Sequence, residues 1–220
     1  MLQHSQRQLE LVEIDPPKLS PQLSSEYQDS VQMLQDHPHW FNGPKLICLK
    51  VEERACVYRT DYATNTLIHQ YGEKAGLGLG PVWAGAVFYN MKGQLLLTKR
   101  SPEVFSYAGL WTFPTGGGMI PGEDPYRAMS RELKEEWGED IVHGTETPEF
   151  LATVWGQVPE SAGLGFVWKI LVRDDSVFDP DPSETAEWKW CKPDRLPQPL
   201  GSTTKEIFQL PGLIPHLSKG

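Results

Sequence analysis

GGMIPGEDPYRAMSRELKEEWG, residues 117–138, is the stretch from which the organisation of the whole chain can be worked out. Its middle predicts one amphipathic helix over residues 124–137, with Asp124 at the N-cap and Pro125 in the first turn. Gly138 follows the last turn, where a glycine commonly ends a helix. The apolar residues that recur every four positions, and that we expect to face the core, are Met129, Leu133 and Trp137.

The other face of this helix is acidic. Glu132, Glu135 and Glu136 fall within about one quadrant of the helix surface, at roughly 100° per residue. Neighbouring carboxylates repel one another, and a divalent cation would reverse that repulsion, since Mg²⁺ prefers oxygen ligands and takes carboxylates together with substrate phosphates. Taken alone, such a run is most often a solvated helix face, so the spacing of the surrounding residues has to decide.

That spacing resembles the signature of the Nudix hydrolases. The signature runs G, five residues, E, seven residues, and then R-E-U-x-E-E-x-G-U, where U is bulky and apolar. Here Gly117 and Glu123 are followed at the same spacing by RELKEEWG, residues 131–138. The last position departs from the signature, with Glu139 in place of an apolar residue and Ile141 two residues later. This departure concerns the exit from the helix rather than the metal site.

The resemblance implies a fold, a reaction and a cofactor. The Nudix fold is an α/β/α sandwich with a mixed sheet, and Nudix enzymes hydrolyse a nucleoside diphosphate linked to another moiety, with Mg²⁺ or Mn²⁺. A cation is needed because a pyrophosphate presents crowded anionic oxygens to an incoming water. The expected partner is therefore a small nucleotide-linked molecule.

The resemblance also implies roles for the acidic residues of the motif. Glu132 and Glu136 are expected to be the primary metal ligands, and Glu135 a third ligand or the base that orients water. A main-chain carbonyl near Gly116 is expected to complete the metal site.

Further charged residues belong to the expected site. Arg131 is expected to pair with Glu123 and so to fix the loop against the helix. Family members often carry another acid in a late loop, and of Glu184 and Glu187 we favour Glu184, because it precedes the predicted strand and is freer to reach the metal. Arg100 is a candidate for a substrate phosphate, since the planar guanidinium suits phosphate oxygens. The predicted catalytic set is Glu123, Arg131, Glu135 and Glu136.

The rest of the chain predicts an α/β protein in two parts. We expect an N-terminal extension over residues 1–76, with a loose start, a helix and a strand pair, and a Nudix domain over residues 77–220. Besides the central helix, we expect helices over residues 24–35 and 203–209. The expected strands cover residues 45–51, 54–58, 82–89, 94–99, 111–114, 150–154, 166–172 and 187–190. The expected irregular segments are residues 1–25, a polar loop over 59–65 and a linker over 76–81.

The extension carries a second resemblance. WFNGPK at residues 40–45 and RTDYATN at residues 59–65, followed by glycines at residues 78–80, resemble the UDP-glucose diphosphatase branch of the Nudix proteins. This implies a nucleoside diphosphate sugar, UDP-glucose or UDP-galactose, that is cleaved to a nucleoside monophosphate and a sugar phosphate.

The same segments supply the candidate substrate residues. Trp40 or Tyr62 is expected to stack on a base, and Thr64 or Asn65 to bond a uracil edge or sugar hydroxyls. The full candidate set is Lys45, Arg59, Tyr62 and Thr64 from the extension and Arg100 from the main domain.

Other interpretations stay open. A Nudix hydrolase acting on ADP-ribose, a dinucleotide, coenzyme A or a nucleoside triphosphate is one alternative, and a non-catalytic module that binds a nucleotide and regulates a partner is another. The coenzyme A pattern expects an arginine where Phe105 stands and two glycines directly after Phe-Pro, where Thr115 intervenes. The intact glutamate set argues against the regulatory module.

Composition limits the partners. The net charge of −9 argues against non-specific binding to nucleic acid or membrane, because both surfaces are anionic. The three cysteines, Cys48, Cys56 and Cys191, show neither a disulfide framework nor zinc spacing. The first residues lack a signal pattern, so we expect a cytoplasmic protein. The oligomeric state is left open.

Overall fold

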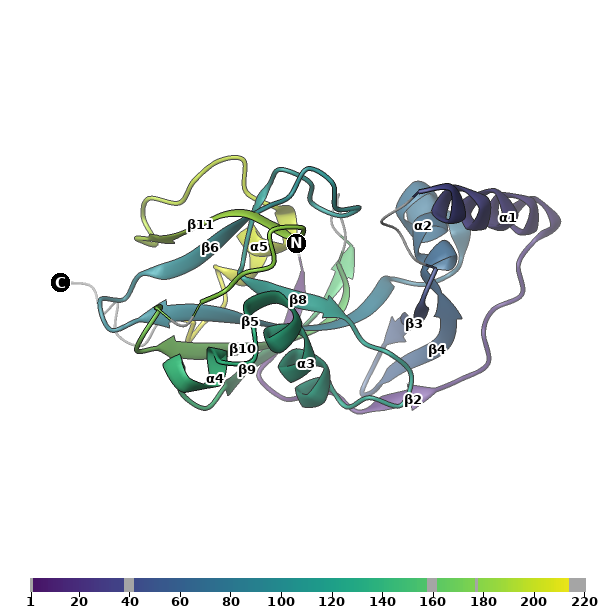
Figure 1. Ribbon diagram of the computed structural model, residues 1–220. Helices are drawn as coiled ribbons and strands as arrows, with labels where there is room; N and C mark the ends of the chain where they lie inside the picture. Colours follow the sequence, from purple (N-terminus) through teal and green to yellow (C-terminus); the bar gives the residue numbers. More distant parts are fainter. Residues whose placement is uncertain (1, 38–41, 158–161, 177, 214–220) are drawn as a thin grey trace.

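Helix α3 (Pro125–Trp137) confirms the central prediction, and it packs on strand β5 (Gly80–Asn90) of the computed structural model (Figure 1). The carboxylate of Asp124 accepts a hydrogen bond from the backbone N–H of Arg127 at 3.0 Å, which caps the first turn. The structure describes residues 2–37, 42–157, 162–176 and 178–213.

The remaining elements follow in chain order. The strands are β1 (Gln3–Ser5), β2 (Leu11–Glu13), β3 (Pro44–Val51), β4 (Ala55–Asp61), β6 (Leu95–Arg100), β7 (Trp111–Thr112), β8 (Thr115–Gly118), β9 (Glu149–Gln157), β10 (Ala162–Val172) and β11 (Thr185–Cys191). The helices are α1 (Pro21–Asp36), α2 (Tyr62–Tyr71), the 3-10 turn η1 (Gly72–Ala75), α4 (Ile141–Gly144) and α5 (Ser202–Ile207).

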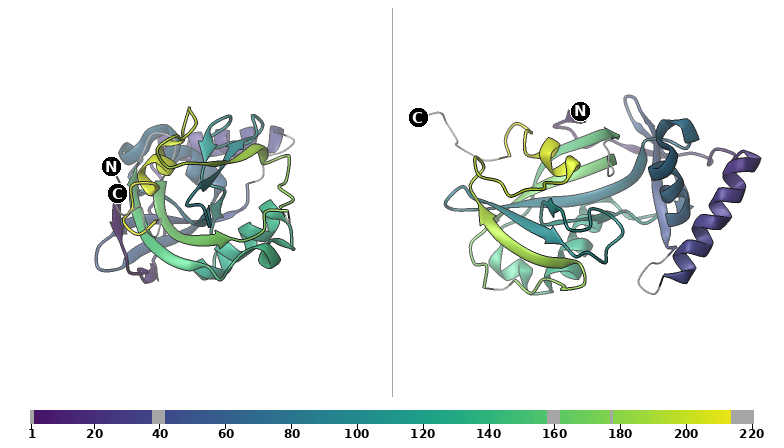
Figure 2. Two further views of the ribbon diagram at one scale, coloured as in Figure 1. Left: turned by 90° about the vertical axis from the view of Figure 1, so that its left-hand side faces the viewer. Right: turned by 90° about the horizontal axis from the view of Figure 1, so that it is seen from above.

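The strands form one mixed, curled sheet with the main path β1-β9-β10-β5-β3-β4-β2 (Figure 2). The β5–β10 pair is parallel, whereas β9–β10 and β3–β5 are antiparallel. Side chains of β5 alternate between two cores, with Phe88 on the side of α3 and Val87 on the other side. Met129 and Trp137 of α3 fill the first core, and Ile207 of α5 lies in the second. Helices therefore cover both faces of the sheet, and the α/β fold class is confirmed.

The N-terminal extension continues this sheet. Strand β3 pairs with β5 through Ile47 opposite Pro81 and Cys48 opposite Gly80. A separate small core forms between β3, β4 and α2, with Ile47, Tyr58 and Leu67 fully buried. Helix α1 lies at the outer edge of this part (Figures 1 and 2). None of the helices in the described ranges is both long and apolar enough to span a bilayer.

The structure differs from the sequence-based expectations about the elements in three places. Residues 1–25 are not loose throughout, because β1 pairs with β9, β2 pairs with β4, and α1 starts at Pro21. The segment 59–65 is not a loop, because β4 continues to Asp61 and α2 follows at once. The glycines after Pro114 form strand β8, which pairs with β5. These elements are short or polar, so their apolar periodicity is weak.

Candidate active site

A cavity of about 760 Å³ opens beside the acidic face of α3. Its walls come from α3, β8, the end of β6, residues 103–107 and the turn before β11, and also from β3 and α2 of the extension. The motif residues on its wall are Gly116, Gly117, Glu132, Glu135 and Glu136. The predicted residues from outside the motif that line it are Lys45, Tyr62, Asn65, Arg100 and Glu184.

Arg131 holds the acidic end of this cavity together. Its guanidinium donates to both carboxylate oxygens of Glu123, at 3.0 and 3.1 Å, so the pairing expected from the motif is present. One further nitrogen, Nη1, donates to Glu132 at 2.6 Å and to Glu135 at 3.0 Å. Nη2 also donates to the carbonyl of Gly118 at 3.2 Å. Arg131 thus ties the loop, β8 and two of the three helix carboxylates into one unit.

Glu132 is packed against the backbone of β8. A Cβ atom on Gly117 would lie 2.1 Å from its carboxylate, so only glycine leaves room for the side chain. Burial raises the pKa of Glu132, and the positive charges of Arg131 and Lys45 oppose this rise. Glu135 is different, because its side chain is 58 % exposed.

Glu136 is the most enclosed of the three carboxylates. The hydroxyl of Thr115 and the backbone N–H of Gly116, the latter at 3.3 Å, both donate to its Oε2. Burial raises the pKa of Glu136 to about 8, and the neighbouring charge of Glu132 adds to the rise. A cation that approaches this carboxyl would lower its pKa, because the positive charge favours the ionised form.

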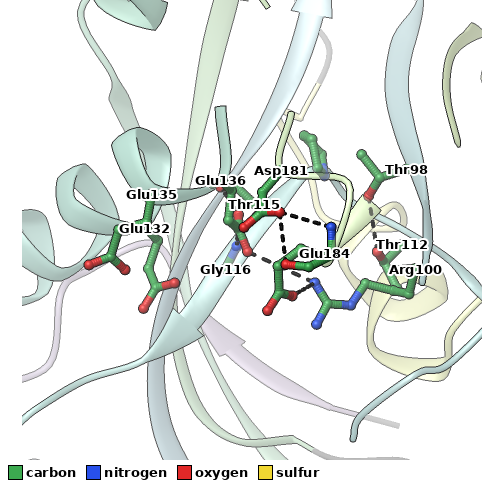
Figure 3. A network of polar contacts seen from close by, with 12 residues as sticks. Thr98, Arg100, Thr112, Thr115, Gly116, Glu132, Glu135, Glu136, Asp181 and Glu184 are labelled. Carbon is green, nitrogen blue, oxygen red and sulfur yellow. Dashed lines mark hydrogen bonds and ion pairs between the residues drawn. The ribbon is translucent and has the colours of Figure 1, made fainter. Parts of the chain in front are cut away.

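Arg100 joins this group from the end of β6. Its Nη1 lies 2.7 Å from Glu184 Oε2 and 4.0 Å from Glu136 Oε1. Figure 3 shows Arg100, Glu136 and Glu184 converging from β6, α3 and the turn before β11. Glu187 is not on the cavity wall and lies 3.9 Å from Lys189, so Glu184 is the late acid that reaches the site.

Two of the candidate substrate residues do not reach the cavity. Arg59 pairs with Glu13 at 2.6 Å on the exposed side of β4. Thr64 is buried, and its hydroxyl lies 2.6 Å from that of Thr60. Neither residue lies in the polar loop that the sequence predicted: Arg59 is an exposed position of strand β4, and Thr64 is a buried position of helix α2. Trp40 lies outside the described residues.

The sequence-based interpretation also missed residues that line the cavity. Asp181 and Ser183 come from the loop before β11, and Phe105 and Tyr107 come from the loop after β6. No motif marks these loop residues, because their positions depend on how the two loops pack. Asn65, by contrast, was one of the two residues expected to bond a uracil edge or sugar hydroxyls, and it lines the wall from α2.

Comparison with known proteins places this geometry in a family. A model of the NUDIX domain matches residues 81–210. The protein belongs to the Nudix family. Its motif residues, from Gly117 to Gly138, lie inside the matched range.

Relatives of this Nudix protein have different activities in their names. The chain is 27 % identical over 141 residues to an RNA pyrophosphohydrolase of Erythrobacter litoralis, covering 57 % of this chain and 84 % of that protein. It is 32 % identical over 127 residues to an isopentenyl-diphosphate Delta-isomerase of Paenarthrobacter aurescens, covering 56 % and 67 %. The crystal structure of a MutT NUDIX hydrolase from Burkholderia pseudomallei aligns with a TM-score of 0.45 and 27 % identity, over 59 % of this chain and 95 % of that one.

The Nudix motif residues provide the donors that a divalent metal requires. Within the described ranges no three acidic, histidine or cysteine side chains are already gathered as a metal cluster. The reason lies in their present partners, since Arg131 holds Glu132 and Glu135, while β8 holds Glu136. The donors are carboxylate oxygens, two of them buried with raised pKa values, and this is the ligand chemistry of a hard divalent cation. With the family shown and three glutamates of its motif on one cavity, the protein is a Nudix pyrophosphohydrolase, and enzymes of this family generally use divalent metals.

Proposed function

We propose that this Nudix enzyme hydrolyses the pyrophosphate bond of a nucleoside diphosphate sugar with Mg²⁺ or Mn²⁺. UDP-glucose and UDP-galactose are the favoured substrates, and the products are a nucleoside monophosphate and a sugar phosphate. One observation carries the proposal: the catalytic carboxylates and side chains of the N-terminal extension line the same cavity.

Each group at the acidic end has a role in this reaction. Glu132, Glu136 and Glu184, with the carbonyl of Gly116, are the proposed ligands of the cation. The cation would supply charge neutralisation for the phosphate oxygens and activation of the attacking water. Glu135, whose side chain is the most exposed of the three on α3, orients that water.

The charged residues around these ligands position the loop, helix α3 and the phosphate groups of the substrate. Arg131 and Glu123 hold the loop and α3 at a fixed distance through two parallel hydrogen bonds. Arg100 and Lys45 provide positive charge on the cavity wall for the phosphate groups. Arg100 must exchange part of its contact with Glu184 for a phosphate oxygen, which a guanidinium can do without losing its charge.

The motif alone does not select the substrate, because every Nudix substrate presents a diphosphate to it. The extension supports the sugar nucleotide, since Lys45 and Tyr62 belong to the segments that resemble the UDP-glucose diphosphatase branch and both line the cavity. The names of the relatives add two rivals, an RNA end and isopentenyl diphosphate. ADP-ribose, dinucleotides, coenzyme A and nucleoside triphosphates are the others, together with nucleotide binding without turnover.

A substrate panel tests the proposal directly. The full chain with Mg²⁺ is assayed on UDP-glucose, UDP-galactose, ADP-ribose, coenzyme A, nucleoside triphosphates, 5′-triphosphorylated RNA and isopentenyl diphosphate. We expect the UDP-sugars to have the highest kcat/KM and, in ¹⁸O-water, the label to appear on a phosphate product. A higher kcat/KM for any other compound of the panel would identify that compound as the preferred substrate. Tight nucleotide binding without turnover would favour the regulatory module.

Glu136→Gln tests the metal site, with Glu139→Gln as the matched control. We expect Glu136→Gln to lower kcat by about 10²-fold or more, because it removes a charge that acts on the transition state. Glu139 follows the same helix and pairs with Lys134 at 2.6 Å, away from the cavity, so its variant should retain full activity. Near-normal turnover of Glu136→Gln at saturating Mg²⁺ would exclude Glu136 as a ligand.

A further inference from the structure

Asn65 combines two properties that rarely occur together. It lies on the cavity wall, and it is only 4 % exposed. Its carbonyl oxygen Oδ1 is buried and has no hydrogen-bond partner among the residues that the structure describes. A buried oxygen left without a hydrogen bond destabilises the fold, so such groups are uncommon unless something else binds them.

The neighbouring polar side chains of α2 are satisfied. The hydroxyl of Thr64 lies 2.6 Å from that of Thr60, and the hydroxyl of Thr66 donates to the carbonyl of Ala63 at 2.7 Å. Asn42, the other nearby amide, accepts from the backbone N–H of Ala63 and donates to Asp61. The open hydrogen-bonding position at Asn65 is therefore not a general property of this helix.

Asn65 lies one helical turn from a tyrosine that neighbours the acidic end of the cavity. Lys45 lies close to Gly118 of β8, where an added Cβ would come within 2.7 Å of Nζ, so it borders the acidic end. The same Nζ lies 5.3 Å from the ring centroid of Tyr62. Tyr62 and Asn65 are three residues apart on α2, and both line the cavity. The contacts thus lead from the carboxylates through Lys45 to the α2 side of the cavity, to which Asn65 belongs.

Two aromatic rings line the cavity near α2. The rings of Tyr62 and Phe105 meet edge to face with centroids 5.3 Å apart, and both residues line the cavity. Flat aromatic faces beside an amide suit a nucleobase, which needs a stacking surface and one hydrogen-bonding edge.

We propose that Asn65 determines base specificity by binding the hydrogen-bonding edge of the substrate's nucleobase. Its Oδ1 accepts the base N–H, and its amide nitrogen donates to the adjacent carbonyl or ring nitrogen of the base. This inference rests on the proposed function, because it assigns the base of the nucleotide to the side of the cavity built by the extension. In a uracil nucleotide the edge is N3–H with a neighbouring carbonyl.

Binding of monophosphates to the full chain in EDTA tests this proposal without turnover. UMP, CMP, AMP and GMP are titrated calorimetrically, together with analogues methylated on the base nitrogen, 3-methyl-UMP first. We expect the wild-type protein to bind the preferred monophosphate about 10-fold or more tighter than its methylated analogue. Asn65→Leu and Asn65→Ala should remove this difference. Gln70→Ala, an exposed amide on the same helix, is the matched control and should keep it.

The outcomes separate the two proposals. A difference that persists in both Asn65 variants, or that is absent from the wild-type protein for all four bases, overturns the role of Asn65. Wild-type base discrimination that disappears in the variants supports it, whether or not a sugar nucleotide is hydrolysed. Failure of every nucleoside diphosphate sugar to turn over would overturn the proposed substrate alone. Both variants should fold, because the buried Oδ1 that they remove makes no hydrogen bond within the described residues.

Discussion

At the scale of single residues, Gly117 shows how tightly the acidic face of α3 is packed. Its backbone is not strained, but an added Cβ would lie 2.1 Å from the carboxylate of Glu132. We expect Gly117→Ala to displace Glu132 from the cavity wall while leaving the fold intact. Because a shift of about 1 Å in a catalytic group can cost on the order of 10²-fold, kcat/KM should fall at least about 10-fold. Activity measured against Mg²⁺ concentration, beside the melting temperature Tm, checks this; an unchanged Mg²⁺ midpoint would contradict it.

Glu136 should make the stability of the metal-free protein depend on pH. Its pKa is raised from 4.5 to about 8 in the folded state, so between these values the unfolded chain binds fewer protons than the folded chain. Stability from this group therefore falls as pH rises from about 5 to 8. Glu136→Gln removes the dependence, so in EDTA the variant should gain at least about 4 °C in Tm relative to wild type between pH 5 and pH 8. Parallel Tm curves for the two proteins would contradict this.

At the scale of elements, strand β3 of the extension brings a half-buried lysine to the acidic end of the cavity. Burial lowers the pKa of Lys45, the charge of Glu132 opposes this, and the side chain lines the cavity. We expect Lys45→Met to raise KM about 10-fold, since hydrogen bonds to charged groups contribute about 1.5–3 kcal/mol. Lys50→Met is the matched control, because Lys50 is on the same strand but pairs with Glu52 at the surface. Equal KM values in the two variants would show that Lys45 does not contribute to substrate binding.

The elements also show what a sequence can predict. Helix α3 was predictable because its cap, apolar spacing and terminal glycine agree, and the motif then places Glu123 opposite Arg131. Helix α2 was not, because residues 62–66 are rich in threonine and asparagine and lack a clear apolar face. Its start is marked only by Asp61, which accepts from the backbone N–H of Thr64. Of the side chains proposed for substrate in this segment, Tyr62 and Asn65 therefore line the cavity, whereas Arg59 and Thr64 do not.

The loops around the cavity were the least predictable part of the site. Asp181 and Phe105 line it because loops distant in sequence fold over the same end of the sheet. No local pattern encodes that convergence. The late acid Glu184 could be nominated from its position before a strand, but its contact with Arg100 depends on the pairing of β11 with β6.

At the scale of the whole molecule, the extension and the Nudix domain share a core. Leu46, Cys48 and Val57 of the extension belong to the same buried cluster as Trp137 of α3. A chain containing only residues 77–220 would expose this apolar surface and the edge of β5. We expect it to aggregate or to lack a cooperative melting transition, whereas the full chain unfolds in a single calorimetric transition. A soluble 77–220 fragment that melts cooperatively would show that the boundary at residue 76 separates two independent units.

The acidic end of the cavity also governs how a substrate first meets the protein. The chain carries a net charge of −9, and Glu132 and Glu135 place negative charge on one wall of the cavity. A free nucleotide approaching by diffusion is itself anionic and is repelled by this field, whereas a nucleotide already chelated by a divalent cation is much less so. Added salt shortens the range of the repulsion. Productive encounters are therefore expected to involve the chelate, and their rate should rise with ionic strength, opposite to the behaviour of proteins that attract nucleotides with a basic surface.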